Sequence, residues 1–266
     1  MTLEPLLVFE LALLGMCTGF LAGLLGIGGG MLMVPFMTFI LSAKGFPAEY
    51  TVKMAVATSL STICFTSLSS VRAHHQRGAV LWPVVRLLAP GILVGSLLGA
   101  QVAVALSGKF LSILFALFVG FSATQMFLDR KPKPARTLPG GWGMFGVGSL
   151  IGVLSSLVGA GGAFISVPFM TWCNVKIHNA VGTSAALGFP IAVAGTVGYI
   201  WAGLDMPQMP AGAIGYLYLP GLAVIATASV IFAPLGARLA HRMDTKPLKK
   251  VFATVLYGLA AYFLIH

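Results

Sequence analysis

The sequence predicts an all-α polytopic membrane protein made of two inverted-topology repeats, each with about five helical segments. Three observations predict this fold: the composition, a glycine-rich stretch that occurs twice, and the charge of equivalent loops. The 266 residues are 58% hydrophobic and only 8% charged, with a mean hydropathy of +0.97, whereas soluble domains carry about 25% charged residues. The apolar runs are long and lack the alternation of barrel strands, which favours membrane-spanning helices.

Short polar loops separate the apolar runs and define the expected segments. In the first half we expect helical segments at about residues 5–25, 31–43, 48–71, 79–106 and 110–128. In the second half we expect them at about residues 141–158, 164–173, 179–202, 213–240 and 248–265. A basic, proline-rich linker at residues 129–140 is expected to be solvated and to join the two membrane repeats, residues 1–128 and 141–266.

The glycine-rich stretch at residues 26–37 recurs at residues 159–170, in each case followed by Val-Pro. Glycines in an apolar run favour a helix break, since they destabilise the helix and adopt left-handed backbone angles. In a membrane such a break survives only where it is buried in protein or lines a polar cavity. Breaks at matching places in two halves indicate a transport site, and we expect the two to meet near the midplane as helical hairpins that either span or re-enter.

Equivalent loops of the two halves carry opposite charge bias. The loop after residue 71 holds Arg72 and Arg77, whereas its counterpart holds only Asp205. The loop near Lys109 carries that single basic residue, whereas its counterpart at residues 238–250 carries five. Positive loops face the cytoplasm, so equivalent loops are predicted on opposite sides of the membrane, with the linker cytoplasmic and both termini periplasmic.

The doubled Gly-x-Gly-Gly-Gly-x-x-x-Val-Pro unit, the Ala-Thr-Ser stretch at residues 57–59 and the Gly-Thr-Ser-Ala stretch at residues 182–185 resemble the sulfite exporter TauE/SafE family of membrane permeases. The resemblance covers essentially the full chain. The second copy departs from the pattern at Ala160 and Ala163, so the two hairpins need not contribute equally. The resemblance implies transport of small sulfur-containing or carboxylated anions, such as sulfite, sulfoacetate or organosulfonates, across a bacterial inner membrane.

The residues themselves favour an anion. Helices expected to start at Met31 and Phe164 would present unpaired N–H groups and partial positive charge, and consecutive glycines allow those groups to converge. Close helix packing is the alternative for the glycines, and a bond to the helix's own carbonyl is the alternative for the hydroxyls. The predicted substrate-binding residues are Gly28, Gly29, Gly30, Met31, Thr58, Ser59, Gly161, Gly162, Ala163, Phe164, Thr183 and Ser184.

Charged and aromatic residues supply further candidates. Only six carboxylates occur in the chain, which disfavours a cation or metal carrier. Four residues are candidates for gates or for the anion path: Lys53, Arg86, His178 and Trp201. Lys53 and His178 could equally be interfacial anchors, and Arg86 could extend its charge to the membrane interface.

We therefore expect a secondary transporter that works by alternating access, with no catalytic or metal site, no cofactor and no nucleic-acid partner. Its partners would be a small anion and the lipid bilayer, and the sequence leaves the oligomeric state open. The alternatives are an anion or small-solute channel, or a transporter of another small carboxylate anion. A channel would show no exchange stimulation by substrate on the far side of the membrane.

Overall fold

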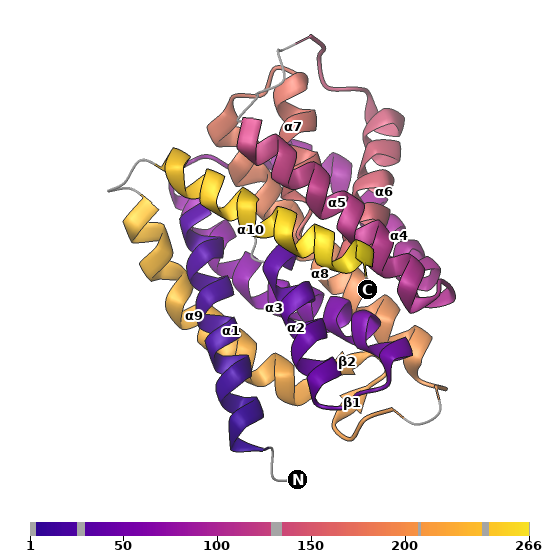
Figure 1. Cartoon of the computed structure of the whole chain (residues 1–266). Coiled ribbons are helices and arrows are strands. Elements are labelled where there is room, and N and C mark those ends of the chain that lie inside the picture. The colour runs from indigo at the N-terminus through magenta and orange to yellow at the C-terminus, as the bar shows by residue number, and fades with distance from the viewer. Residues whose placement is uncertain (1–3, 26–29, 129–134, 207–208, 241–244, 266) are drawn as a thin grey trace.

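A computed structural model of the chain describes residues 4–25, 30–128, 135–206, 209–240 and 245–265 (Figure 1). Within these ranges the chain forms ten helices and one two-stranded sheet. The helices of the first half are α1 (Pro5–Leu25), α2 (Gly30–Ala43), α3 (Ala48–Gln76), α4 (Trp82–Ala105) and α5 (Gly108–Leu128). The second half contains α6 (Gly141–Val158), α7 (Ala163–Trp172), α8 (Ile177–Gly203), β1 (Ala213–Ile214), β2 (Leu217–Tyr218), α9 (Leu219–Ala240) and α10 (Thr245–Ile265).

One predicted segment is wrong at its start. The segment expected at residues 213–240 begins with an antiparallel β-hairpin, in which Ala213 pairs with Tyr218, and the helix starts only at Leu219. The turn uses Gly215, whose φ of +54° suits a residue without a Cβ. Apolar side chains concealed this hairpin, because a short apolar strand and the first turn of a membrane helix have the same composition.

Two helix pairs join the halves of the chain through glycines. α1 packs on α9, and a Cβ at Gly15 would lie 2.7 Å from the carbonyl oxygen of Ile225. α6 packs on α4 in the corresponding way, since a Cβ at Gly148 would meet the carbonyl oxygen of Leu88. Small residues allow such close backbone approach between membrane helices.

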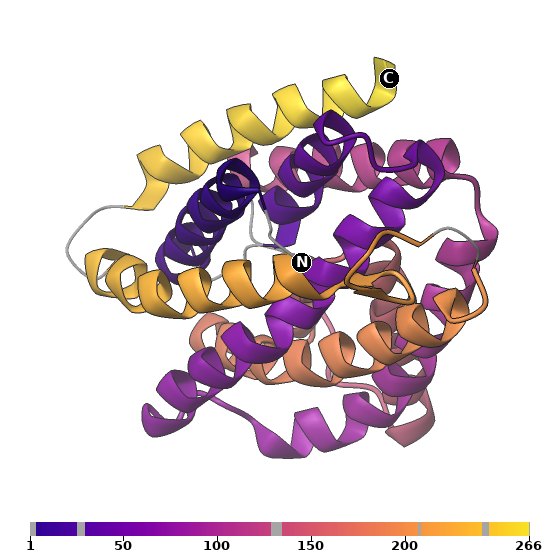
Figure 2. The same cartoon turned by 90° about the horizontal axis from the view of Figure 1, so that it is seen from below.

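The helices α3 and α8 occupy the centre of the molecule. They pack against each other, and Figure 2 shows α3 running through the middle of the molecule, with α10 along one side. Every residue of α3 from 51 to 63 is buried. α5 and α10 lie side by side, with the rings of Phe115 and Phe263 5.4 Å apart between their centroids.

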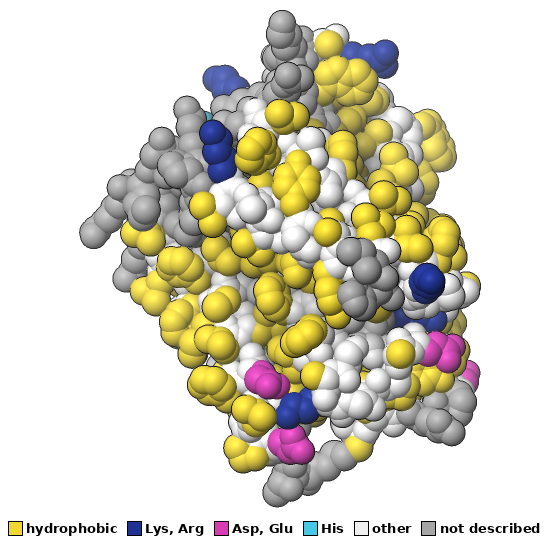
Figure 3. All heavy atoms as spheres, viewed as in Figure 1, with side chains coloured by type: hydrophobic (Ala, Val, Ile, Leu, Met, Phe, Trp, Pro, Cys, Tyr) yellow, Lys and Arg dark blue, Asp and Glu magenta, His cyan; other side chains and the backbone are white. Residues whose placement is uncertain are grey.

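The surface is that of a multi-pass membrane protein. Hydrophobic side chains cover most of the face in Figure 3, and the Asp and Glu side chains visible there lie in its lower half. Among the described residues, seven helices are long and apolar enough to cross a bilayer: α1, α3, α4, α5, α6, α8 and α9. The helices that follow the glycine stretches have only 14 residues (α2) and 10 residues (α7), short of the roughly 20 that a full crossing needs.

Candidate functional site

The second glycine-rich stretch breaks the chain between α6 and α7, as the sequence predicts. Gly159 and Gly162 have φ values of +69° and +75°, in the left-handed region that favours glycine. The amides of Gly159 and Ala160 both donate to the carbonyl oxygen of Ser155, which ends α6. α7 then begins at Ala163, one residue before its expected start.

The start of α2 lies against this break. Gly28 and Gly29 fall outside the described residues, and α2 begins at Gly30. A Cβ at Gly30 would lie 2.5 Å from the carbonyl oxygen of Gly159 and 3.3 Å from the Cα of Ala160. Met31 follows as a buried residue. The second break and the helix that follows the first glycine stretch are therefore in direct contact.

The first Thr-Ser pair ties α3 to both the break and the hairpin. The Ser59 hydroxyl donates to the carbonyl oxygen of Gly159 at 2.9 Å, across the two halves of the chain. Thr58 Oγ1 accepts a hydrogen bond of 3.2 Å from the amide of Tyr218, at the end of β2. Both hydroxyl-bearing residues are fully buried.

The second Thr-Ser pair has matching roles. Thr183 Oγ1 accepts a hydrogen bond of 3.0 Å from the amide of Leu81, the residue before α4. Thr58 likewise bonds the residue before α9. The hydroxyl oxygens of Ser184 and Ser166 are 2.7 Å apart. Ser166 also donates a hydrogen bond to the carbonyl oxygen of Gly162. The hydroxyls of Thr58, Ser59, Thr183 and Ser184 therefore bond groups outside their own helix, whereas Ser166 bonds the i−4 carbonyl of α7.

The glycines of the break face different surroundings. A Cβ at Gly162 would lie 2.5 Å from Ile191 Cδ1 and 3.0 Å from Ser155 Oγ, and one at Gly159 would lie 2.8 Å from Val34 Cγ2. Close packing therefore explains the absence of a side chain at these two positions, in addition to their backbone angles.

Gly161 lies on the open side of the break. Among the described residues, a Cβ there would contact only Ile63 Cγ2, at 3.7 Å. Gly188 on α8 is similarly uncrowded, since a Cβ there would lie 3.6 Å from the Gly161 carbonyl oxygen and 3.7 Å from Ser67 Cβ. Both glycines are buried. Within the described part of the chain, Gly161 and Gly188 are thus less crowded than Gly159 and Gly162.

Polar groups that find no partner among the described residues border this break. Within the described ranges, neither the Gly161 amide nor the Gly162 amide donates a hydrogen bond to the protein. The buried hydroxyl of Ser155, also without a partner among the described residues, lies beside Gly162. Buried donors normally find an acceptor, and the N-terminus of α7 adds partial positive charge. The sequence reasoning missed Ser155, although a serine one turn before the second glycine stretch was visible.

The four candidate gate residues are not brought together. Lys53 is only 4% exposed, and its ammonium donates to the carbonyl oxygen of Val104 at 2.8 Å. Arg86, His178 and Trp201 have exposed side chains on other elements. In the described part of the chain, no three His, Cys, Asp or Glu side chains are grouped so that they could hold a metal ion.

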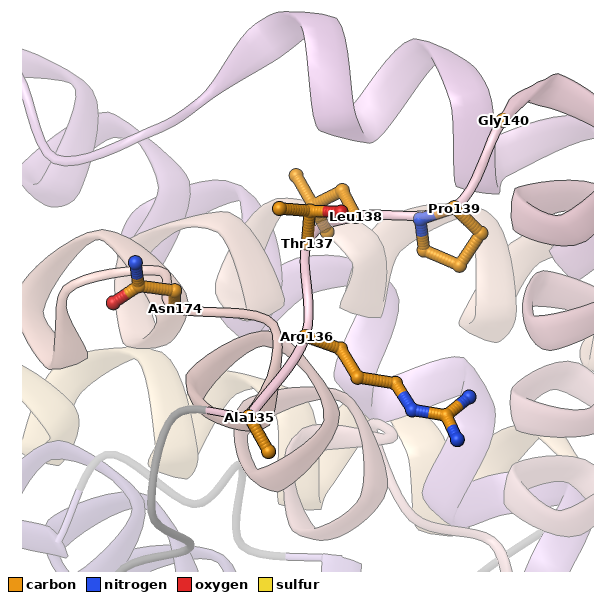
Figure 4. Close-up of a pocket in the computed structure, with 7 residues that line it drawn as sticks. All are labelled: Ala135, Arg136, Thr137, Leu138, Pro139, Gly140 and Asn174. Carbon is orange, nitrogen blue, oxygen red and sulfur yellow. The ribbon is translucent and has the colours of Figure 1, made fainter.

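A cavity of about 830 Å³ lies where the linker enters α6 (Figure 4). The Arg136 guanidinium lies 5.0 Å from the centroid of the Trp172 ring, and the amides of Ala135 and Arg136 donate to the Trp172 carbonyl oxygen. This part of the linker is thus docked on the C-terminal end of α7. The cavity contains none of the predicted site residues and is lined by Ala135, Arg136, Thr137, Leu138, Pro139, Gly140 and Asn174.

Comparison with known proteins gives consistent results over nearly the whole chain. A family model described as sulfite exporter TauE/SafE matches residues 11–263. A probable membrane transporter protein of Haemophilus influenzae is 35% identical over 250 residues, which cover 93% of this chain and 94% of the relative. A probable membrane transporter protein of Methanocaldococcus jannaschii is 26% identical over 272 residues, covering 99% and 96% of the two chains. No solved structure matches the chain.

Proposed function

The chain belongs to the sulfite exporter TauE/SafE family, and from that premise we propose that it is a secondary transporter of small sulfur-containing anions. Sulfite, sulfoacetate and organosulfonates are the substrates proposed. The protein binds and moves the anion without performing chemistry on it, and it uses no cofactor.

The observation that carries this proposal is the contact between the second glycine break and the start of α2. Gly30 touches the break at Gly159, and the amides of Gly161 and Gly162 have no protein acceptor in the described ranges. Two helix N-termini and unpaired amides stabilise negative charge. The oxygen atoms of a sulfite or sulfonate group suit such donors, and the uncrowded side of Gly161 provides the space for them.

The proposed binding site contains the predicted residues from both halves of the chain. Each hairpin contributes its glycines and the first residues of the following helix, and the hydroxyls hold the two hairpins in place. The proposed residues are Gly28, Gly29, Gly30, Met31, Thr58, Ser59, Gly161, Gly162, Ala163, Phe164, Thr183 and Ser184, to which we add Ser155 and Gly188.

We further propose that residues 1–128 and 141–266 are inverted repeats that rock around this site in alternating access. The corresponding contacts of Gly15 and Gly148, and the corresponding bonds of Thr58 and Thr183, support two halves of the same plan. In Figure 1, α1 ascends from the N-terminus while α6 descends from the opposite end, which supports opposite orientation. Transporters of this kind expose a fixed site to each side in turn.

The proposed orientation in a bacterial inner membrane follows from charge. The helix ends near Glu4 and Glu49 are taken as periplasmic, together with both termini. The end of α3 that carries Arg72 and Arg77 is taken as cytoplasmic, together with the linker at residues 129–140, because positive loops remain inside.

The experiment is counterflow of labelled sulfoacetate and sulfite into proteoliposomes that contain the purified protein. Substrate loaded inside should accelerate uptake of the label, because a carrier exchanges its substrate across the membrane. Flux without such stimulation would identify an anion or small-solute channel instead. Stimulation by small carboxylates and not by sulfur anions would identify a carboxylate transporter.

A matched pair of variants tests the site. Gly161→Ala adds a methyl group that fits sterically but fills the open side of the break, so we expect the protein to fold and counterflow to fall at least tenfold. Gly146→Ala adds the same group on an exposed part of α6 where nothing lies within 4 Å, and should transport normally. Full transport by Gly161→Ala would contradict the proposed site.

A further inference from the structure

The β1–β2 hairpin covers one end of the central helices and inserts two tyrosines. Tyr216 in its turn is 1% exposed and Tyr218 is 3% exposed. The Tyr216 ring packs edge-on against Tyr50 of α3, at 6.0 Å between centroids, and against Tyr199 of α8, at 6.3 Å. Figure 1 shows the hairpin at the end of the molecule where α3 starts and α8 finishes.

Directly beneath this hairpin lies a buried ammonium group. Lys53 Nζ is 5.8 Å from the centroid of the Tyr216 ring and donates to the carbonyl oxygen of Val104. An ammonium has three N–H donors, and only this one acceptor is found for it in the described ranges. Among the described residues no carboxylate is within ion-pair distance of Lys53, and that of Glu49 acts on its charge only from farther away. Glu49, one turn earlier on α3, is exposed.

Stabilisation of a helix end accounts for only part of this arrangement. Val104 is the penultimate residue of α4, so its carbonyl oxygen has no partner within the helix, and a donor there is favourable. A neutral amide side chain could donate the same hydrogen bond. A buried cation in a membrane segment is costly without a counter-charge, which makes it a candidate functional group.

The hairpin is connected to the glycine break through α3. Tyr218 donates its amide to Thr58, and the next residue, Ser59, holds the Gly159 carbonyl oxygen. Lys53 lies five residues before Thr58, about 7.5 Å along the helix axis. Withdrawal of the hairpin would therefore uncover Lys53 and release a contact adjacent to the break at the same time.

We propose that the Lys53 ammonium is a second anion-binding point, which receives the oxygen atoms of the sulfur anion when the hairpin withdraws Tyr216. This inference rests on the proposed function and names the first contact at the hairpin end of the path. Burial raises the pKa of Tyr216 to about 12, so its phenol stays protonated and adds no negative charge beside Lys53. At the position of α8 that corresponds to Lys53, His178 is exposed and no equivalent hairpin covers it in the described ranges.

Substitution at Lys53 separates charge from helix capping. Lys53→Gln keeps an N–H donor for Val104 and removes the charge, whereas Lys53→Arg keeps the charge. The first readout is the KM of sulfoacetate counterflow. The second is the sulfoacetate concentration that gives half of the maximal rise in the thermal unfolding midpoint. We expect Lys53→Gln to raise both concentrations by at least about tenfold, as for loss of one charge-assisted hydrogen bond. Lys53→Arg should retain most of the affinity.

The control is Lys44→Gln, which removes a cation at the same end of the protein but outside the path, and should leave both readouts unchanged. Wild-type affinity in Lys53→Gln would overturn the role of Lys53 while leaving the proposed function intact. A wild-type protein that neither exchanges nor binds sulfur anions would instead contradict the proposed function.

A measurement on the wild-type protein covers the case in which Lys53→Gln fails to fold. An amine-reactive reagent is applied during counterflow and Lys53 acylation is quantified by mass spectrometry. Turnover should raise the labelling of Lys53, and saturating sulfoacetate without turnover should lower it, with Lys44 labelled equally throughout. Lys53 labelling that responds to neither condition, including no labelling at all, would overturn the proposal.

Discussion

The substitution Gly162→Ala tests whether the chain turns in left-handed conformation at the second break. Gly162 has φ +75°, and a residue with a Cβ pays about 1–2 kcal/mol to adopt such an angle. The new Cβ would also lie 2.5 Å from Ile191 Cδ1 and 3.2 Å from Ile151 Cγ2, and overpacking of this kind costs about 1–3 kcal/mol. We therefore expect the free energy of unfolding to fall by about 2–5 kcal/mol.

Gly161→Ala provides the comparison one residue away. Gly161 does not have a positive φ, and its Cβ would make only an ordinary contact with Ile63 Cγ2 at 3.7 Å. We expect its unfolding free energy to stay within about 0.5 kcal/mol of wild type. The two variants thus differ in backbone strain and crowding but not in the group that is added.

The assay is reversible unfolding in mixed micelles, with helix content followed by circular dichroism as denaturing detergent is added. Equal stability of Gly162→Ala and wild type would refute the left-handed turn at this residue. An equal loss in both variants would refute the distinction between the crowded and open sides of the break.

Three further perturbations test the contacts between the halves and at the surface. Ser59→Ala leaves the buried carbonyl oxygen of Gly159 without its donor, so the unfolding free energy measured in the same micelles should fall by about 1–3 kcal/mol; an unchanged value would show that the hydrogen bond of 2.9 Å contributes nothing. Thr183→Val removes the acceptor of the amide that precedes α4, so hydrogen exchange at that amide should accelerate, and an unaltered rate would exclude the bond. The hydrogen bond from Lys44 to Glu4 raises the pKa of Lys44 above 10.5, so the ion pair stabilises the fold below that pH and is lost as the pH rises through the folded-state pKa. The stability of wild type should therefore decline more steeply in that range than that of Lys44→Gln, and parallel pH profiles would count against the pair.

The helical segments and their order were predictable because membrane insertion imposes a strong local signal. An apolar run of sufficient length forms a helix, since every backbone group must be satisfied within the segment. The bounds of α1 and α6 match the expected ranges, and the start of α2 differs by one residue. The break at Gly159–Gly162 was predictable for the same local reason, because glycines interrupt an apolar helix.

The partners of the candidate site residues were not predictable in this way. Ser59 and Gly159 are 100 residues apart, and neither the hydropathy nor the glycine pattern specifies that they touch. The hairpin at Tyr216 was missed because its strands of two residues each are apolar and short. The role of Lys53 depends on a carbonyl oxygen of α4 and a ring of the hairpin, two groups that lie far away in the sequence.

The sequence by itself determined that this is a helical membrane protein of the TauE/SafE family, where its helices lie, and where glycines interrupt them. Those properties follow from local composition, because the bilayer requires each segment to satisfy its own backbone. Only the tertiary structure decided that α2 starts against the second break, that Gly162 is crowded while Gly161 makes an ordinary contact, and that Tyr216 covers Lys53. These arrangements depend on which apolar faces pack together, and many faces of similar composition compete for the same contacts.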